Sequence, residues 1–460
     1  MAENTIAAVA TAPGEAGIGI VRISGSKAIS IADALFKSKN NMTLTEAENR
    51  KLYYGNIIDP ETEKLIDEVL IVKMKGPHSY TAEDVVEINC HGGSISVRRI
   101  LQLVLRQGAV LAEAGEFTKR AFLNGRIDLS QAEAVMELIS AKTDSVFDVS
   151  MKQLNGQLSR EIEAIRDHLL RMLAHIQVSI DYPEDDIEEV TFEELEEDGQ
   201  KAYDKISYLL SSVDTGKILR DGLKTVILGK PNVGKSSLMN AVLKEERAIV
   251  TDVPGTTRDI IEEYVNIHGI PLKIVDTAGI RDTEDLVEKI GVTKAKDLVV
   301  NADLIIAVFD KSEPLTEEDL DIIDLIKGKQ SIILLNKTDL PSAFEIEGIE
   351  SKINHQHIFE ISALNHQGLD QLENTLKEMF FAGDINIKQD LVVTNVRHKI
   401  QLEKALKNLS DALGAIRMGV TVDCIEVDLK DCWSNLGEIS GDTVQEDIIA
   451  KIFKEFCVGK

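Results

Sequence analysis

The octapeptide at residues 229–236, Gly-Lys-Pro-Asn-Val-Gly-Lys-Ser, most constrains what this chain can fold into. An apolar run at 225–228 precedes it, and a helix-like run at 237–243 follows it. In this strand–loop–helix context, the spacing G-x-x-x-x-G-K-[ST] is typical of a phosphate-binding loop. Its glycines let backbone N–H groups close around phosphate oxygens, and the helix N-terminus adds a favourable dipole. The sequence therefore predicts an α/β domain that binds a nucleotide, the alternative being a Gly-rich turn with an incidental lysine.

The segment at 336–339, Asn-Lys-Thr-Asp, indicates which base is bound. It follows an apolar run at 332–335 that is typical of a buried strand. The Asp339 carboxylate can accept hydrogen bonds from N1–H and the 2-amino group of guanine, a donor pair that adenine lacks. Ser362 and Ala363, which follow another apolar run, fit the loop that backs the base. These motifs favour GTP over ATP.

Phosphate and metal contacts are expected from three places in the chain. Lys235 is expected to reach the β- and γ-phosphates, and the Ser236 hydroxyl to ligate Mg²⁺. Downstream, Asp276 can hold Mg²⁺ through water, and Thr257 supplies a switch threonine as a further Mg²⁺ ligand. The expected GTP contacts are Asn232, Val233, Gly234, Lys235, Ser236, Ser237, Thr251, Thr256, Thr257, Asp276, Thr277, Ala278, Gly279, Asn336, Lys337, Asp339, Ser362 and Ala363.

The position after the Asp-x-x-Gly motif departs from GTPases of the Ras type. Those proteins place a Gln there to orient the attacking water, whereas this chain has Ile280, which can neither orient nor activate water. Hydrolysis must therefore use another group or be very slow. Glu288 is the nearest candidate substitute, the alternative being a solvated charge at the start of a helix.

Composition indicates a chain of several domains without a membrane segment. A length of 460 residues suggests about three domains, and 43% hydrophobic with 28% charged residues is typical of a soluble globular protein. No apolar run is long enough to span a bilayer, and the N-terminus lacks a basic signal region, so a cytoplasmic protein is expected. The four cysteines show no Cys-x-x-Cys spacing, which argues against zinc and a disulfide framework.

The formal net charge of −27 opposes binding of nucleic acid by the chain as a whole. Contact with RNA must then come from local basic patches or from a basic partner. Candidate patches lie at 98–99, at 119–120 together with Arg126, and at 397–399. For each of them an ordinary solvated surface is the alternative.

The apolar pattern changes along the chain and predicts its domain organisation. Short β-rich runs at 18–23 and 69–73 alternate with helical patches, which indicates an α+β domain. Apolar residues then recur every three or four positions over 154–180, and again over 402–413, as in amphipathic helices. The predicted fold is multidomain, α+β and α/β, with a Ras-like P-loop GTPase domain inserted into a discontinuous helical domain. The predicted domains are 1–122 (N-terminal α+β), 123–215 (first helical half), 216–381 (GTPase) and 382–460 (second helical half).

Several segments outside the nucleotide motifs carry a family resemblance. They are Ala-Pro-Gly at 12–14, Gly-Ile-Val-Arg-Ile-Ser-Gly at 19–25, Tyr-Thr-Ala-Glu-Asp at 80–84, His-Gly-Gly at 91–93, Gly-Glu-Phe-Thr at 115–118, Ala-Phe-Leu-Asn at 121–124 and Phe-Cys-Val-Gly-Lys at 456–460. With an interior GTPase segment, they make essentially the whole chain resemble the MnmE (TrmE) family of tRNA-modification GTPases.

This resemblance implies a homodimer that works with an FAD-containing MnmG-type partner on tRNA. Together they would form a carboxymethylaminomethyl or aminomethyl group at C5 of the wobble uridine, U34. The N-terminal domain would mediate dimerisation and bind a tetrahydrofolate derivative of the 5-formyl or 5,10-methylene type. By position, the folate contacts would be Arg22, Glu87, Arg126 and Lys460. Cys457 matches the family's C-terminal cysteine, either as a functional thiol or as a small apolar residue in a helix.

The resemblance also offers an answer to the missing Gln. It implies a K⁺ ion near the phosphates, in place of an arginine finger, in a site formed when two GTPase domains meet. By position the K⁺ ligands would be Asn232, Thr251, Val253 and Thr256. Glu288 coincides with the family's water-orienting glutamate, so the expected catalytic residues are Glu288, Lys235 and Asn232.

Two other classes of function are alternatives to this one. A ribosome-assembly or signalling GTPase usually carries an appended RNA-binding module, such as a KH domain with its Gly-x-x-Gly loop, and none is evident here. A scaffold with a degenerate nucleotide site conflicts with the intact Lys235, Ser236, Asp276 and Asp339. The folate-type residues near both termini favour the tRNA-modification function.

Overall fold

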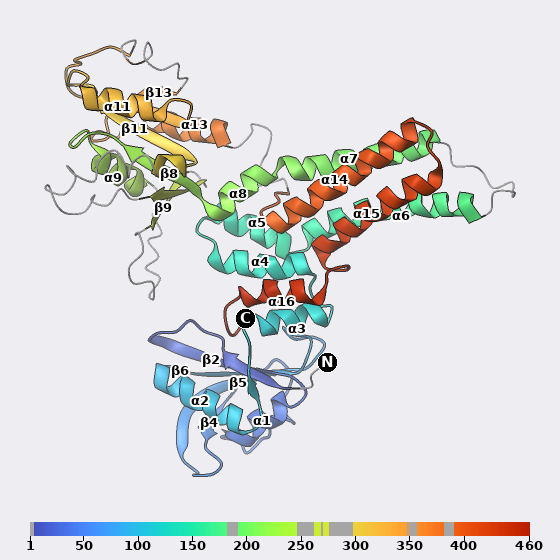
Figure 1. Cartoon of the computed structure of the whole chain (residues 1–460). Helices are drawn as coiled ribbons and strands as arrows, with labels where there is room; N and C mark the ends of the chain where they lie inside the picture. The colour runs from blue at the N-terminus through green and yellow to red at the C-terminus, as the bar shows by residue number, and fades with distance from the viewer. Residues whose placement is uncertain are drawn as a thin grey trace. The chain divides into compact units, whose positions relative to one another are not determined.

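The computed structural model describes residues 4–181, 192–245, 262–267, 270–275, 298–346, 349, 357–380 and 391–460 (Figure 1). The chain divides into two compact units, each built from segments that are distant in the sequence. Among the described helices, none combines the length and the apolarity needed to cross a bilayer. The first unit comprises Met1–Met136, Gln153–Arg166 and Trp433–Lys460, and the second comprises Glu137–Lys152 and Asp167–Cys432.

A seven-stranded sheet forms the centre of the first unit, in the order β3-β4-β5-β6-β2-β1-β7. Neighbouring strands are antiparallel, except that β1 and β7 are parallel. The predicted strands at 18–23 and 69–73 lie inside β2 and β5 and are confirmed. The strands are β1 (Ile6–Val9), β2 (Ala16–Ser24), β3 (Phe36–Ser38), β4 (Tyr53–Ile58), β5 (Leu65–Met74), β6 (Val85–Gly92) and β7 (Val110–Leu111).

Helices α1 (Ala28–Leu35) and α2 (Ser94–Arg106) share one apolar core with this sheet. Along α2 the buried residues are spaced three or four apart, which places them on one face of the helix. A smaller core joins α3 (Glu116–Leu123) to α16 (Glu446–Lys454), and it includes Phe453. The C-terminal segment is thereby brought back to the N-terminal sheet, where Ala114 and Val458 form a β-bridge.

Helices α6, α7, α14 and α15 are the longest of the remaining described helices. Helices α7 and α14 lie side by side (Figure 1), and a Cβ on Gly199 of α7 would lie 2.8 Å from Leu413 Cδ2 of α14. Arg417 and Glu196 form an ion pair of 2.6 Å across the same two helices. The bounds are α4 (Leu129–Ser140), α5 (Asp144–Leu154), α6 (Gln157–Asp181), α7 (Phe192–Ser211), α8 (Val213–Asp221), α14 (Val396–Arg417) and α15 (Val422–Ser440).

The apolar pattern over 154–180 belongs to two helices rather than one. Leu154 is the last residue of α5, and Gly156 adopts a φ of +75°, a left-handed conformation that ends the helical path. Helix α6 then carries the rest of the pattern, with Leu158, Ile162 and Leu169 fully buried.

A six-stranded sheet organises the nucleotide-motif part of the second unit, in the order β13-β12-β11-β8-β10-β9. All neighbouring strands are parallel except the edge strand β9, which is antiparallel to β10. Apolar runs at 225–228, 272–275 and 332–335 lie within β8, β10 and β12, and the run at 358–361 covers β13 and one residue beyond it, so the strands expected before the motifs are confirmed. The strands are β8 (Leu223–Leu228), β9 (Glu262–Ile267), β10 (Ile270–Val275), β11 (Leu304–Asp310), β12 (Ser331–Asn336) and β13 (Ile358–Glu360).

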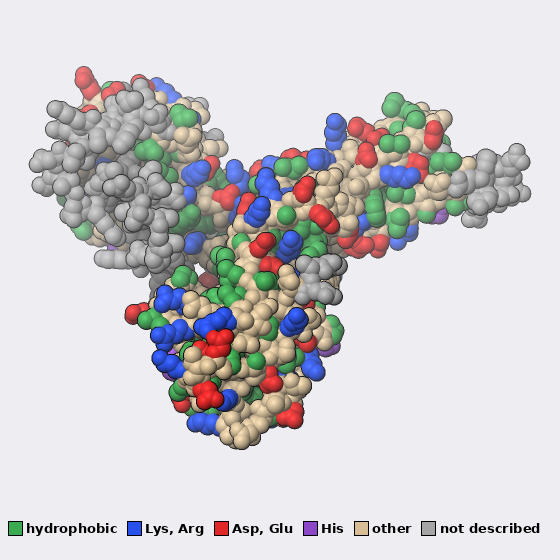
Figure 2. All heavy atoms as spheres, turned by 60° about the horizontal axis from the view of Figure 1, so that its bottom comes forward, with side chains coloured by type: hydrophobic (Ala, Val, Ile, Leu, Met, Phe, Trp, Pro, Cys, Tyr) green, Lys and Arg blue, Asp and Glu red, His purple; other side chains and the backbone are tan. Residues whose placement is uncertain are grey.

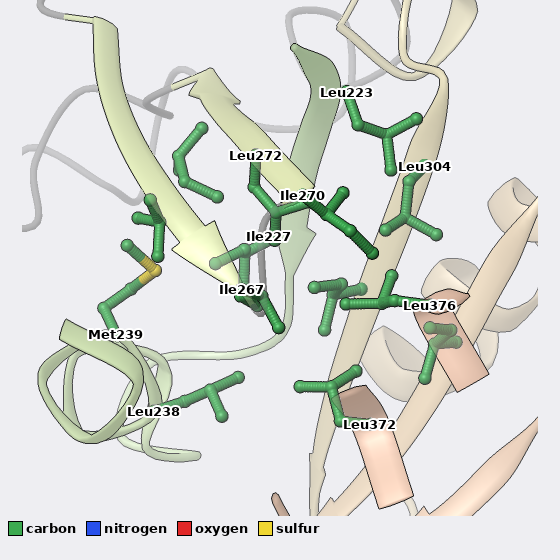
Figure 3. Packing of buried hydrophobic residues seen from close by; sticks show 14 of the residues in the cluster. Leu223, Ile227, Leu238, Met239, Ile267, Ile270, Leu272, Leu304, Leu372 and Leu376 are labelled. Atoms are coloured by element: carbon green, nitrogen blue, oxygen red, sulfur yellow. The ribbon is translucent and has the colours of Figure 1, made fainter. Parts of the chain in front are cut away.

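Helices α9 (Lys235–Glu245), α11 (Glu317–Ile326) and α13 (Leu369–Phe380) complete this sheet's packing. Figure 3 shows one of its cores, where Ile227 and Leu272 of the strands meet Met239 of α9 and Leu372 of α13. Helix α11 belongs to a second core. Because parallel strands all end at one edge, the loops after β8, β11 and β12 are gathered at that edge.

Candidate functional site

The phosphate loop connects β8 to α9 in a conformation that depends on two glycines. Gly229 has a φ of +156° and Gly234 a φ of +98°. A Cβ on Gly234 would lie 2.2 Å from Asn336 Nδ2, and one on Gly229 would lie 2.5 Å from the Val308 carbonyl oxygen. Neither position has room for a side chain. The motif glycines are therefore required both by backbone conformation and by the close approach of neighbouring strands.

The side chain of Lys235 is folded back over the loop that precedes it. Its ammonium donates hydrogen bonds of 2.7 Å to the carbonyl oxygens of Gly229 and Lys230. Burial lowers the pKa of Lys235, because the charged form loses solvation there. Asn232 and Ser236, predicted as K⁺ and Mg²⁺ ligands, are both exposed, and Asn232 has a φ of +63°. Both oxygen donors are thus open to an incoming ligand.

Asn336 joins the phosphate loop to the two loops that are predicted to bind the guanine base, the base loop at 336–339 and the loop at 362–363. Its side-chain amide donates to the Val233 carbonyl oxygen at 2.8 Å, and its amide oxygen accepts from the Ala363 N–H at 3.0 Å. The Ser362 hydroxyl donates to Asp339 Oδ1 at 2.6 Å, and the Asp339 residue is exposed. Three segments that are far apart in the sequence therefore meet around one buried amide.

Lys337 of the base loop is anchored on the end of the neighbouring strand. Its ammonium lies 2.5 Å from Asp310 Oδ2, the last residue of β11. Burial raises the pKa of the Asp310 carboxyl, but hydrogen bonds from Lys337 and Ser312 outweigh it, so this pKa lies below its usual range. Asp310 was not among the predicted residues.

Other predicted nucleotide and ion contacts fall outside the described residues. They are Thr251, Val253, Thr256, Thr257, Asp276, Thr277, Ala278, Gly279 and Glu288.

A second candidate site lies on the sheet of the first unit. Arg22 of β2 is directly opposite Glu87 of β6, and Arg22 Nε lies 2.8 Å from Glu87 Oε1. The Arg22 guanidinium carbon is 5.2 Å from the centroid of the Tyr80 ring, and that of Arg126 is 4.7 Å from the same centroid. Three of the four predicted folate contacts therefore meet around Tyr80, a residue that sequence reasoning did not assign.

The C-terminal tail reaches the same place. Arg22 Nη1 donates to the Gly459 carbonyl oxygen at 3.4 Å, and the Phe117 N–H donates to the Lys460 carbonyl oxygen at 3.2 Å. Gly459 has a φ of +93°, and a Cβ there would lie 2.1 Å from the Val9 carbonyl oxygen. The tail is thus fitted closely against the first strand, and Lys460 directly follows the residue whose carbonyl oxygen Arg22 contacts.

The environment of Cys457 contradicts one of its two interpretations. Helix α16 ends at Lys454, and Cys457 is an exposed free thiol rather than a buried helical residue. Its carbonyl oxygen accepts hydrogen bonds from the N–H groups of Gly115 and Lys460, both at 3.3 Å. Within the described part of the chain, no cluster of His, Cys, Asp and Glu could hold a metal ion.

Ion pairing and burial reduce the free positive charge in two of the basic patches that were predicted as RNA contacts. Arg120 is largely buried and forms ion pairs with Glu83 at 3.1 Å and Glu116 at 2.8 Å, so its charge is already compensated. His398 is fully buried in α14. Figure 2 shows acidic and basic side chains interspersed on the visible face. Arg120 and His398 therefore add little free charge to the patches at 119–120 with Arg126 and at 397–399, and RNA contact there stays a prediction.

The geometry around Asn336 defines a class of protein, a P-loop GTPase with a guanine-type base loop. Comparisons with known proteins give its family. The model described as "GTP-binding protein TrmE N-terminus" matches residues 5–126, and that described as "MnmE helical domain" matches 129–457. The chain belongs to the MnmE family of tRNA modification GTPases.

Individual relatives match along their whole length. The tRNA modification GTPase MnmE of Alkaliphilus oremlandii is 58% identical over 458 residues, covering 100% of this chain and 99% of that protein. The protein of the same name from Clostridioides difficile is 56% identical with the same coverage. A solved G domain of the T. maritima FeoB iron transporter is 25% identical, covers 34% of this chain and 97% of its own, and has a TM-score of 0.26.

Proposed function

We propose that this chain is a K⁺-stimulated GTPase that acts with an FAD-containing MnmG-type partner on tRNA. The pair forms the carboxymethylaminomethyl or aminomethyl group at C5 of the wobble uridine, U34. Full-length similarity to tRNA modification GTPases supports the proposal, and the Asn336 contacts are the structural observation that carries its GTPase half. The proposed domains are 1–122, 123–215, 216–381 and 382–460, with the GTPase domain inserted into the helical one.

In the proposed nucleotide site, the described residues bind and orient GTP. Asp339 accepts the guanine N–H groups, and Ser362 holds its carboxylate through Oδ1. Two N–H groups of the Lys235 ammonium bond the Gly229 and Lys230 carbonyl oxygens, and the third is free for phosphate oxygens, whose charge restores the electrostatic stabilisation that burial removes. Ser236, with Thr257 and water held by Asp276, is assigned to Mg²⁺, which neutralises charge on the β- and γ-phosphates when bound.

The proposed hydrolytic machinery replaces the absent Gln with two other groups. Asn232, exposed in the phosphate loop, is assigned to K⁺ together with Thr251, Val253 and Thr256. A monovalent cation held there would supply positive charge between the β- and γ-phosphates, the role that an arginine finger has in other GTPases. Glu288 is assigned the orientation of water. We further propose that the K⁺ site is completed when two GTPase domains of a homodimer meet.

The second site is proposed to bind a tetrahydrofolate derivative of the 5-formyl or 5,10-methylene type. Its chemistry fits that group, because Glu87 can pair with the amino and ring N–H groups of a pterin. Arg22, Arg126 and Lys460 supply cations for glutamyl carboxylates, and such a derivative would supply a one-carbon unit when bound. Cys457 is a candidate functional thiol beside it. With tRNA as substrate, the proposed place of action is the cytoplasm.

Two experiments test this proposal: deletion of the gene followed by complementation, and measurement of GTP hydrolysis in K⁺ and in Na⁺. Cells lacking the protein should lose the C5 modification of U34 in affected tRNAs, and the wild-type gene should restore it. Purified protein should hydrolyse GTP faster in K⁺ than in Na⁺ at matched ionic strength. An unchanged tRNA modification profile would overturn the modification function, and equal rates in the two salts would overturn the K⁺ mechanism.

A further inference from the structure

The connection between β11 and α11 contains none of the predicted GTP contacts, yet its two ends lie against the phosphate loop and the 336–339 loop. At its start Asp310 holds Lys337 of the base loop. At its end Thr316 and Asp319 contact Lys230, the second residue of the phosphate loop. The same connection therefore touches both loops that are expected to bind GTP. The contact with Lys230 has no assigned role.

Lys230 and Asp319 form an ion pair that is almost fully buried. The Lys230 ammonium lies 2.8 Å from Asp319 Oδ2, with the two side chains 12% and 3% exposed. The Lys230 ammonium also donates to the Thr316 hydroxyl at 3.1 Å. Breaking such a pair by removing one partner is costly, because the other charge stays buried without compensation. A buried pair therefore fixes a long side chain that would otherwise be free to move.

Asp319 is itself held rigidly at the start of α11. Its Oδ2 accepts hydrogen bonds of 2.8 Å from both the backbone N–H and the hydroxyl of Thr316, and the first of these is one half of a capping box. Asp319 is thus fixed to the first turn of a helix that packs in the sheet's second core. It provides a rigid support for the Lys230 side chain.

The other end of Lys230 leads directly to the phosphate-binding lysine. The Lys230 carbonyl oxygen accepts a hydrogen bond of 2.7 Å from the Lys235 ammonium. An ordered path therefore runs from the α11 capping box through Lys230 to Lys235. We propose that Thr316 and Asp319 are positioning residues for the phosphate loop, which act through Lys230 to orient Lys235. This inference rests on the proposed nucleotide site.

Removing the charge of Asp319 distinguishes two ways in which this residue could affect nucleotide affinity: by positioning the phosphate loop, or by direct electrostatic repulsion of the phosphates. Asp319 is a negative charge near a loop that binds anionic phosphates, so Coulomb interaction alone predicts that Asp319→Asn tightens nucleotide binding. Positioning predicts the opposite result, because the variant loosens Lys230. The sign of the change in GDP affinity therefore decides between them.

The experiment compares full-length Asp319→Asn and Lys230→Met with the wild type. We expect each variant to raise the Kd for fluorescent GDP about tenfold and to lower kcat for GTP by a similar factor. The double variant should be no worse than either single variant, because both changes remove the same interaction. Lys230→Arg should keep both constants within about twofold, since a guanidinium can reach the same carboxylate.

Matched controls distinguish the possible failures. Lys327→Met removes a lysine from the exposed Lys327–Asp324 pair just beyond the other end of α11, and it should leave Kd and kcat unchanged. Wild-type affinity in Asp319→Asn or Lys230→Met, tighter binding in Asp319→Asn, or a lowered Tm with unchanged constants would overturn the positioning role. Failure of the nucleotide site itself would appear separately, as GTP hydrolysis that survives Lys235→Ala.

Discussion

The two candidate sites are built on different kinds of sheet. This difference decides how many residues of each site can be predicted from sequence motifs. The nucleotide loops follow parallel strands, which end at a common edge, so short motifs after β8 and β12 are brought together by topology alone. The second site lies on an antiparallel sheet, where Arg22 and Glu87 meet through strand pairing and Lys460 arrives from the end of the chain. No short motif can describe such a site.

Replacing Lys235 should give the largest effect and should affect only the nucleotide site. We expect Lys235→Ala to lower GTP turnover about 10³-fold, because the other lysine of the phosphate loop, Lys230, is held in its ion pair with Asp319. Phosphate release at saturating GTP measures this. Arg22→Met is the matched variant of the other site and should leave turnover unchanged. Substantial hydrolysis by Lys235→Ala would show that the loop is not the catalytic centre.

Changing the base loop should alter specificity rather than chemistry. Asp339→Asn replaces a carboxylate that we propose accepts two guanine N–H groups with an amide that can donate, so GTP affinity should fall about a hundredfold. Xanthine carries a carbonyl where guanine has the 2-amino group, and XTP should therefore bind the variant better than GTP does. Competition against fluorescent GDP measures both affinities. Equal weakening for GTP and XTP would mean that Asp339 does not read the base.

The difference between the sites also marks what the sequence could and could not predict. The strands before the motifs were predictable because they are continuous apolar runs flanked by turn residues, as at 332–335. Asp310 and Asp319 were missed because each acts through a lysine that is distant in sequence. Thr316 and Asp319 did leave a signal, the pattern Thr-Glu-Glu-Asp before an apolar run, which marks a helix start but not its contact with Lys230.

The residues of the second site could be predicted only from the family resemblance, and the reason is physical. Arg22, Glu87, Arg126 and Lys460 have no characteristic spacing, and ordinary surface residues have the same composition. Tyr80 contacts two of them through its ring, a relation that only the folded chain reveals. The break at Gly156 was missed for a related reason, since an apolar period can continue across a tight turn.

A glycine substitution can test whether the C-terminal tail belongs to the second site. Gly459→Ala should weaken binding of 5-formyltetrahydrofolate about tenfold, because its Cβ would displace the tail from Val9 and disturb the Arg22 contact. Calorimetric titration measures the affinity, and GTP turnover should not change. Gly108→Ala is a matched control, since its φ of +103° is similar but nothing lies near its Cβ. Similar losses in both variants would attribute the effect to backbone strain.

The smallest expected effect concerns His91, an exposed imidazole on the sheet that carries the second site. His91 Nδ1 lies 2.6 Å from Asp67 Oδ1, and this hydrogen bond raises the pKa of His91. Burial raises the pKa of Asp67, but hydrogen bonds from Ser96 and His91 outweigh it, so that pKa lies below its usual range. The pair therefore links β5 to the end of β6 without contacting the predicted folate residues.

The signs of these two shifts define a pH window for the pair. The raised pKa of His91 gives stability that is fully present below the unfolded value of about 6.5 and is lost as pH rises through the folded value. The lowered pKa of Asp67 gives stability that is present above about 3.9 and is lost as pH falls through its folded value. Asp67→Asn should return the His91 pKa toward its ordinary value in an NMR titration, while folate and GTP binding stay unchanged. Altered folate affinity in this variant would instead extend the second site to the Asp67 end of the sheet.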